Sequence, residues 1–272
     1  MPLLRTAGYS FDVVTVNPNT PSQWKRVVNA ARASGLRLII GGHPEPFRRT
    51  TSGRWRITPA GTRLLAFLKK QGPVVMALFV YNEPYWIHPL TDQSSSCGAM
   101  SAAELRALRK TIRSVWPAAK IYHDLGHPAA WAPGGYLHEA YSCIGAKYAN
   151  QRGVADYVGI WDYPFRAEGY DREEGLATLA REAAYVVESM GALPVWLNQI
   201  HSGVGGLVLP TPEQLLDWNC ATRAALPPGS LISWYVWRQS IYDDYLANHP
   251  ELWSSTTHAG CPAAPVPAAP PN

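Results

Sequence analysis

Short apolar runs alternate along nearly the whole chain with longer segments in which apolar residues recur every three or four positions. The short runs predict strands buried on both faces of a sheet, and the longer segments predict amphipathic helices. The first pair is FDVVTVN (11–17) and PSQWKRVVNAARASG (21–35), in which Trp24, Val27, Val28 and Ala31 share one helical face. The pair therefore forms one strand–helix unit.

The same unit recurs to the end of the chain. We predict strands at 11–17, 36–42, 74–84, 120–126, 154–165, 193–203 and 231–240. The helices are predicted at 21–35, 58–72, 101–117, within 138–153, at 173–191 and at 211–225. Two helix starts carry capping signals, Thr58 before a proline and Ser101 three residues before Glu104.

Repeated strand–helix units of this length predict a parallel (β/α) barrel, with a doubly wound open sheet as the alternative. A (β/α)8 TIM barrel needs one strand more than this sequence supplies. LLRTAGYS (3–10) is typical of a helix end that leads into a strand. We therefore interpret 1–258 as a single α/β barrel domain that lacks most or all of its first βα unit, and 259–272 as a Pro/Ala-rich tail.

Composition and charge narrow the class of partner. Hydrophobic residues make up 47% of the chain and charged residues 16%, which predicts one sizeable core. The net charge is only +4 and the basic residues are scattered, so nucleic acid is not an expected partner. The longest apolar run, VVMALFV (74–80), is far shorter than the roughly 20 residues that cross a bilayer, so a membrane is not expected either. The oligomeric state stays open.

The cysteines bear on metal binding and on the compartment. Cys97, Cys143, Cys220 and Cys261 have no zinc-ligand spacing, and we expect no metal or other cofactor. Disulfides between Cys97 and Cys143 and between Cys220 and Cys261 would fit an extracellular protein, and four free thiols are the alternative. We favour export, although MPLLRTAGYS (1–10) carries no visible secretory signal.

Polar and aromatic residues follow the predicted strands, at the edge where a parallel barrel carries its active site. Those after the second to fourth strands are His43, Glu45, Asn82, Glu83, Trp86, His123, Asp124 and His127. The later strands add Trp161, Asp162, Tyr163, Asn198, Gln199, His201, Trp234, Trp237 and Arg238. Carboxylates transfer protons, amides bond hydroxyls and indole faces stack on sugar rings, so this set predicts a carbohydrate site.

The strand end Asn82-Glu83-Pro84, three strands before LPVWLNQ (193–199), resembles a known pattern. It is similar to the fourth and seventh strands of the clan A retaining glycoside hydrolases, a barrel superfamily that includes cellulases, mannanases and β-galactosidases. The resemblance extends over about residues 1–250. It implies that Glu83 is the general acid/base, that Asn82 bonds the sugar hydroxyl beside the scissile bond, and that the substrate is a β-linked poly- or oligosaccharide.

The resemblance also assigns the aromatic residues. Tyr163 would be the aromatic of the sixth strand, and Trp237 or Trp234 would form the floor of the sugar site. From the residues alone we expect Trp86 in the same cleft. His43 and His123 are expected to bond substrate hydroxyls or neighbouring carboxylates.

Gln199 departs from the pattern, because the clan has its glutamate nucleophile at this position. Retaining hydrolysis needs a second carboxylate about 5 Å from the first, and an amide is a far weaker nucleophile. A natural loss of the nucleophile and an engineered replacement would both leave a glutamine here. The alternatives are a carbohydrate-binding pseudoenzyme, an inverting enzyme that uses Asp162, and catalysis by a substrate acetamido group oriented by Asn198 or Gln199.

Overall fold

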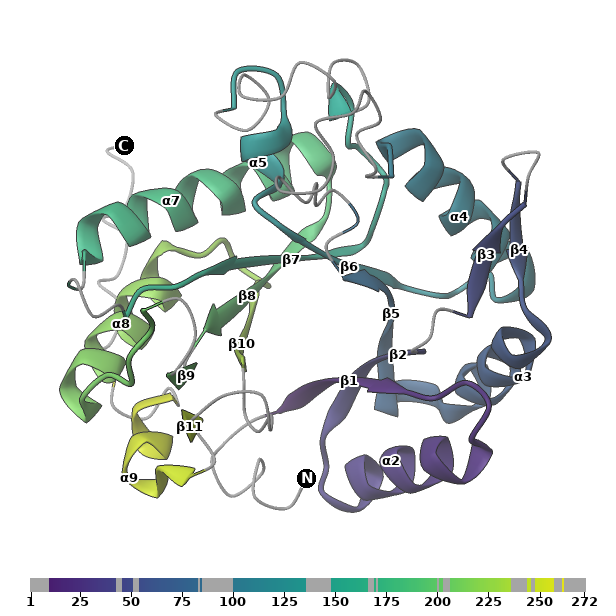
Figure 1. The fold of residues 1–272 in the computed structure, drawn as a ribbon, viewed down its shortest axis with the longest axis horizontal. Coiled ribbons are helices and arrows are strands. Elements are labelled where there is room, and N and C mark those ends of the chain that lie inside the picture. Colours follow the sequence, from purple (N-terminus) through teal and green to yellow (C-terminus); the bar gives the residue numbers. More distant parts are fainter. Residues whose placement is uncertain are drawn as a thin grey trace, which may run out of the picture.

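The computed structural model describes residues 10–42, 46–50, 54–82, 84, 100–135, 148–165, 169, 171–199, 201–202, 206–235, 244–245, 248–256 and 261. Seven parallel strands form the main sheet of this part of the chain, in the order β1-β2-β5-β6-β7-β8-β10 (Figure 1). Their bounds are β1 (Phe11–Val16), β2 (Arg37–Gly42), β5 (Val75–Asn82), β6 (Ile121–Gly126), β7 (Tyr157–Asp162), β8 (Leu193–Gln199) and β10 (Leu231–Tyr235).

The strand order distinguishes the two folds that the sequence left open. Each strand of the main sheet pairs with the next one along the chain, and every pairing is parallel. A doubly wound sheet would instead reverse its order at a switch point. The sheet is therefore a curled part of a (β/α) barrel, and the doubly wound alternative is wrong. β1 and β10 are the outermost of its described strands.

Helices lie on the outer side of the curled sheet (Figure 1). Their bounds are α2 (Pro21–Ala33), α3 (Pro59–Leu68), α4 (Ala102–Val115), α5 (Pro128–Trp131), α7 (Arg172–Tyr185), α8 (Pro212–Ala225) and α9 (Pro250–Trp253), with shorter helical turns at η1 (Lys69–Val74), η3 (Val186–Met190) and η5 (Ser254–Thr256). Both predicted caps are confirmed. The Thr58 side chain accepts a hydrogen bond from the Gly61 amide, and Ser101 and Glu104 form a capping box.

Alternation along the strands divides the core into two layers. Leu38 and Ile40 of β2 face the helices and belong to the large outer cluster. Ile39, between them, belongs to a smaller cluster on the inner face of the curled sheet, together with Tyr122 and Trp161. The continuous apolar runs in the sequence follow from this arrangement, because both faces of the strands are covered.

The segment between β2 and α3, predicted as a loop, contains an antiparallel hairpin of β3 (Phe47–Arg49) and β4 (Trp55–Ile57). A second short pair joins β9 (His201–Ser202) to β11 (Asp244–Tyr245). The strands β3, β4 and β11 escaped prediction because two or three residues are too few for a period of two to be visible. β9 falls within the strand predicted at 193–203 but is separate from β8. The helix predicted within 138–153 lies mostly outside the described residues.

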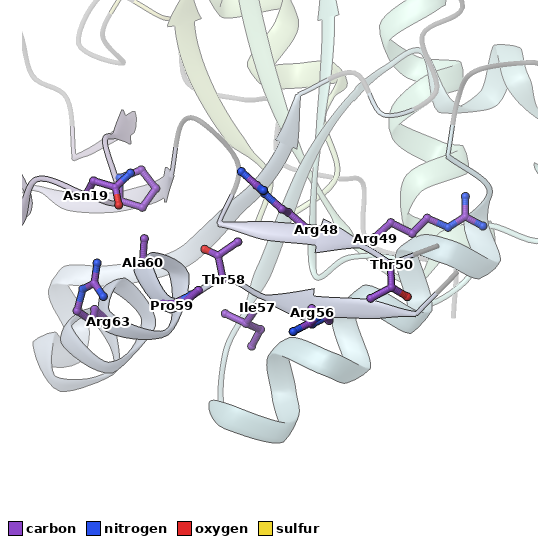
Figure 2. A pocket seen from close by; sticks show the side chains of 11 residues that line it. Asn19, Arg48, Arg49, Thr50, Arg56, Ile57, Thr58, Pro59, Ala60 and Arg63 are labelled. Atoms are coloured by element: carbon purple, nitrogen blue, oxygen red, sulfur yellow. The ribbon is translucent and has the colours of Figure 1, made fainter. Parts of the chain in front are cut away.

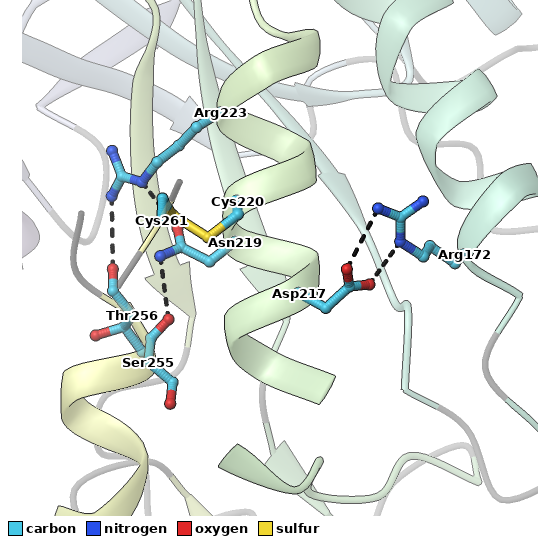
Figure 3. Close-up of a disulfide and its surroundings, with 8 residues drawn as sticks. All are labelled: Arg172, Asp217, Asn219, Cys220, Arg223, Ser255, Thr256 and Cys261. Carbon is cyan, nitrogen blue, oxygen red and sulfur yellow. Dashed lines mark hydrogen bonds and ion pairs between the residues drawn. A yellow bond between two sulfur atoms is a disulfide. The ribbon is translucent and has the colours of Figure 1, made fainter. Parts of the chain in front are cut away.

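The predicted disulfide between Cys220 and Cys261 is confirmed (Figure 3). It connects α8 to the segment after η5, and Asn219 adds a 3.0 Å hydrogen bond from its side-chain amide to the Ser255 carbonyl. The other predicted pair, Cys97 with Cys143, lies outside the described residues. No helix in the described part combines the length and apolar character needed to span a membrane.

Asp156 connects three elements at the amino end of the sheet. Its carboxylate accepts hydrogen bonds from the Arg109 guanidinium at 2.7 Å, from Arg113 at 3.0 Å and from the Ile121 amide at 2.8 Å. The side chain is only 14% exposed, so these bonds are shielded from water. Residues at this face of a barrel serve stability and not catalysis.

We expect Asp156→Ala to lower the free energy of unfolding by about 2–3 kcal/mol, because two guanidinium groups and one amide lose their acceptor. Urea denaturation would measure the loss. Asp217→Ala is the matched control, since Asp217 pairs with Arg172 in an ion pair that is about half exposed (Figure 3) and should contribute less than about 1 kcal/mol. Equal losses in the two variants would contradict the structural role of Asp156.

Candidate active site

The carboxyl ends of the central strands meet at one edge of the sheet. The strand register places Asn82 of β5 opposite Asp124 of β6, and Asp162 of β7 opposite Asn198 of β8. Gln199, the last residue of β8, lies opposite Tyr235 of β10. The polar strand ends singled out in the sequence are therefore brought together along one rim.

Several predicted site residues lie outside the described part of the chain, namely Glu83, His43, Glu45, Trp86 and Trp237. The residues on either side of Glu83 in the sequence are described: Asn82 is the last residue of β5, and Pro84 is buried. Asp162 and Gln199 are described as the terminal residues of their strands. Their roles remain predictions.

Asp124 is a buried carboxylate on the inner face, 8% exposed, close to the hydroxyl of Tyr122. The two groups share the space opposite Gly159, where a Cβ would lie 2.4 Å from the Tyr122 Oη and 3.0 Å from an Asp124 oxygen. Burial, and then the Asp124 charge, raise the pKa of Tyr122 well above its usual range, so the hydroxyl stays protonated. It has no hydrogen-bond partner among the described residues.

Tyr122 is thus a hydroxyl donor beneath the rim that the sequence analysis missed. It lies in the middle of the predicted strand 120–126, whereas the candidate residues of this strand were His123, Asp124 and His127. Strand alternation could have found it, because Tyr122 and Asp124 are two positions apart and so share a face.

His123 occupies the opposite face of β6 from these two residues. Its ring has no exposed surface and stacks against Tyr81 with a centroid distance of 6.5 Å. Burial, and then the Arg109 charge, lower the pKa of His123 to about 3, so the ring is neutral at ordinary pH. This placement gives no support to its predicted contact with substrate.

An aromatic cluster lies where β6 and β7 end. The Trp161 ring is 4.8 Å from the ring of His127 and 5.2 Å from that of Tyr163, both edge to face. Gly126 makes room for it, since a Cβ there would lie 2.8 Å from the indole, and its φ of 69° also favours glycine. Tyr163 is partly exposed at this cluster and stays the predicted aromatic of the sugar site.

His127 also contacts Glu182 of α7, with 4.0 Å between its Nδ1 and a carboxylate oxygen. Burial lowers the pKa of His127 to about 4, so the contact is not an ion pair at neutral pH. Burial likewise raises the pKa of Glu182 to about 7, although the Ala129 amide donates to its carboxylate at 2.7 Å. The pair is thus a contact between α7 and the residue before α5 in which the histidine is neutral.

The raised pKa of Glu182 predicts a pH-dependent effect of Glu182→Gln. The unfolded carboxyl ionises near 4.5 and the folded one near 7, so folding loses stability as the pH rises through this window. The variant lacks this loss, and its stability relative to the unaltered protein should rise by about 3 kcal/mol between pH 4 and pH 8. Urea denaturation at a series of pH values would measure the difference, with Glu173→Gln as the exposed control on the same helix. A difference that does not change with pH would contradict the assignment.

Asn198 does not face the substrate side of β8. It is fully buried, and its side-chain oxygen accepts hydrogen bonds of 2.6 Å from the indole nitrogens of both Trp196 and Trp218. These partners belong to the outer core between β8 and α8. The arrangement is unfavourable for the suggestion that Asn198 orients a substrate group.

No group of three or more potential metal ligands occurs among the residues that the structure describes. The arrangement at the rim consists instead of amides, carboxylates, a buried hydroxyl and aromatic rings. Such a combination can bind hydroxyl-rich rings and transfer protons.

The fold is that of known glycosidase barrels. The structure resembles an exo-β-1,4-mannosidase from Opitutaceae bacterium strain TAV5 with a TM-score of 0.56 and 14% sequence identity, over 93% of this chain and 50% of the mannosidase. It resembles a β-1,4-D-mannanase from Cryptopygus antarcticus with a TM-score of 0.53 and 11% identity, over 93% of this chain and 80% of that one. An endocellulase from Pyrococcus horikoshii matches with a TM-score of 0.50 and 12% identity, over 88% and 77%.

The chain thus spans about half the length of the mannosidase. No protein-family model matches the sequence, and no curated protein matches it. At such low identity, the structural likeness establishes the barrel fold and leaves the activity to be argued from the site.

Proposed function

We propose that this chain is a carbohydrate-active barrel of the glycoside hydrolase type that binds β-linked oligo- or polysaccharides. Glu83 is its general acid/base, and Gln199 occupies the position of the nucleophile. One observation carries the proposal: Asn82, which precedes Glu83 in the sequence, ends β5, and Asn198-Gln199 ends β8, in one parallel sheet with β6 and β7 between them. The resemblance of the fold to structures named as a mannosidase, a mannanase and an endocellulase supports it.

The two strand ends have different chemical capacities. A carboxyl group at Glu83 can protonate the leaving-group oxygen, and Asn82, exposed at the end of β5, can bond an adjacent sugar hydroxyl. An amide at Gln199 neither attacks the anomeric carbon effectively nor carries a charge to stabilise an oxocarbenium-like transition state. The unaltered protein should therefore bind substrate and hydrolyse it poorly.

The assignment has consequences for the rest of the molecule. The strands β1 to β10 of the main sheet correspond to strands two to eight of a (β/α)8 barrel, and the first strand would lie between β10 and β1. The Cys220–Cys261 disulfide is consistent with export to an oxidising compartment.

An inverting mechanism is the second candidate. It is favoured by Asp162, the last residue of β7, which lies opposite Asn198 in the register. Inverting enzymes hold their two carboxyl groups about 6.5–9.5 Å apart, and a carboxylate one strand away from β8 could provide the wider separation. In that case the protein as it stands would be active.

Calorimetric titration with neutral and acidic β-linked oligosaccharides tests the proposal. We expect binding without turnover, and Asn82→Ala should weaken it roughly tenfold through one lost hydrogen bond. Asn29→Ala, at an exposed position on α2, is the matched control and should bind normally. Absence of binding across the panel would exclude a carbohydrate site. Hydrolysis by the unaltered protein that Asp162→Asn abolishes would favour the inverting mechanism instead.

A further inference from the structure

A cavity of about 770 Å³ opens beside the rim, between three segments (Figure 2). The segments are the turn after β1, which carries Asn19, the β3–β4 hairpin, and the first turn of α3, which begins after Thr58. The first two follow the carboxyl ends of β1 and β2, and the third opens the helix after β2. The cavity therefore lies on the same face of the barrel as the candidate active site.

Four arginines line the cavity, and none of the described residues that line it is a carboxylate. Arg49 is neutralised, because its guanidinium forms a 2.5 Å ion pair with Glu104 of α4. Arg48, Arg56 and Arg63 are exposed and have no carboxylate partner among the described residues. Figure 2 shows Arg48 extending toward Asn19 and the start of α3, and Arg49 extending away from them. The cavity thus has a concentrated positive charge on a chain whose net charge is only +4.

Two of these positive charges lie directly across from each other in the hairpin. Arg48 of β3 and Arg56 of β4 are direct cross-strand partners, a placement in which like charges destabilise a hairpin. The hairpin is held instead by its other face, where Phe47 is buried and Ile57 packs on the core. The fold therefore does not need the two arginines, and an anion between them would remove their repulsion.

The hairpin is also joined to the strand that ends in Asn82. β2, which precedes the hairpin, pairs with β5. Trp55 of β4 contacts Tyr81 of β5 with 6.0 Å between ring centroids, one residue before Asn82. Both rings pack against the outer cluster, so a glycan held at Asn82 reaches the cavity where it extends outward past the ends of β5 and β2. An occupant of the cavity and an occupant of the active site can then be parts of the same molecule.

We propose that this arginine cavity binds the carboxylate or sulfate group of an acidic β-linked glycan. The inference rests on the proposed carbohydrate function and specifies its substrate class. Guanidinium groups suit this task, because their planar donors form paired, charge-assisted hydrogen bonds to carboxylate and sulfate oxygens. The volume is sufficient for a sugar ring together with its acidic group.

Titration of the Arg48→Gln/Arg56→Gln double variant tests the inference. The probes are a uronic-acid oligosaccharide, a sulfated oligosaccharide and a neutral β-1,4-linked oligosaccharide of the same length. We expect at least a tenfold loss of affinity for one acidic probe and no change for the neutral one. The acidic probe that loses affinity identifies the group as carboxylate or sulfate. The unaltered protein should also bind that probe more weakly at high salt.

Arg26→Gln/Arg54→Gln is the matched control, because both residues are exposed arginines that do not line the cavity. It removes the same charge and should bind every probe normally. The urea midpoint of the Arg48→Gln/Arg56→Gln variant should be equal to or higher than that of the unaltered protein, since a repulsion is removed. If that variant does not fold, Arg63→Gln on α3 provides the same binding test.

Three outcomes would overturn the inference: equal affinity for acidic and neutral probes, equal losses in the cavity and control variants, or inorganic sulfate that binds as tightly as the acidic glycans. The result is independent of catalysis. Arginine-dependent binding of an acidic glycan, without hydrolysis in any variant, would support the cavity and count against the hydrolase assignment. Hydrolysis of neutral glycans alone would support that assignment and exclude the acidic substrate.

Discussion

Replacement of Gln199 by glutamate is expected to raise kcat/KM toward β-linked substrates by at least about a thousandfold over the unaltered protein. The substitution adds a carboxylate at the end of β8, which can attack the anomeric carbon while Glu83 protonates the leaving group. The product should retain the anomeric configuration, because two displacements occur. The rate would be measured with aryl β-glycosides and with acidic and neutral oligosaccharides as substrates. NMR of the first product would report its anomeric configuration.

Gln214→Glu is the matched control for this change. Gln214 occupies the third position of α8, where its side chain accepts a hydrogen bond from the Thr211 amide and completes a capping box. Glutamate serves equally well in a capping box, so the control adds the same charge without loss of stability. It should leave the activity at background. The double variant Glu83→Gln/Gln199→Glu should be inactive if Glu83 is the acid/base.

An active Gln199→Glu protein would identify β8 as the nucleophile strand and would show that the remaining site is intact. Inactivity of Gln199→Glu, combined with normal oligosaccharide binding, would instead favour a protein that binds glycans without cleaving them. The two outcomes differ in catalysis alone, because both require the rim of β5 and β8 to hold a sugar chain.

The elements of the barrel were predictable because their signals are local. Thr58 and the Ser101–Glu104 pair mark helix starts through contacts within four residues, and the structure contains those contacts. The strand order was predictable only to two alternatives, because repeated strand–helix units occur both in a barrel and in a doubly wound sheet, and the structure has the order of a barrel. The β3–β4 hairpin could not be predicted, because its two three-residue strands carry no local pattern and are stabilised by packing on the core.

The roles of neighbouring polar residues were less predictable for a different reason. Asn198 and Gln199 are adjacent amides in the sequence, and nothing local tells which of them faces the helices. The pairing of Asn198 with the indoles of Trp196 and Trp218 requires α8 to lie against β8, which is a tertiary fact. The burial of His123 depends in the same way on Tyr81, a residue of the adjacent strand.

The tertiary role of Asn198 leads to a large expected loss of stability. Asn198→Leu should lower the free energy of unfolding by about 3–5 kcal/mol, because two buried indole N–H groups lose their acceptor and each such loss costs about 1–3 kcal/mol. Urea denaturation would measure it. Asn29→Leu, at an exposed position on α2, is the control and should change stability by less than about 1 kcal/mol.

A double-mutant cycle tests whether the loss arises from the unpaired indoles. Trp218→Phe in the Asn198→Leu background removes one N–H group that has lost its acceptor. It should therefore lower the free energy of unfolding less there than in the unaltered protein. Strictly additive losses would contradict the shared acceptor. Oligosaccharide binding by the folded fraction of Asn198→Leu should stay normal, because Asn198 faces α8, and a selective loss of affinity would return this residue to the sugar site.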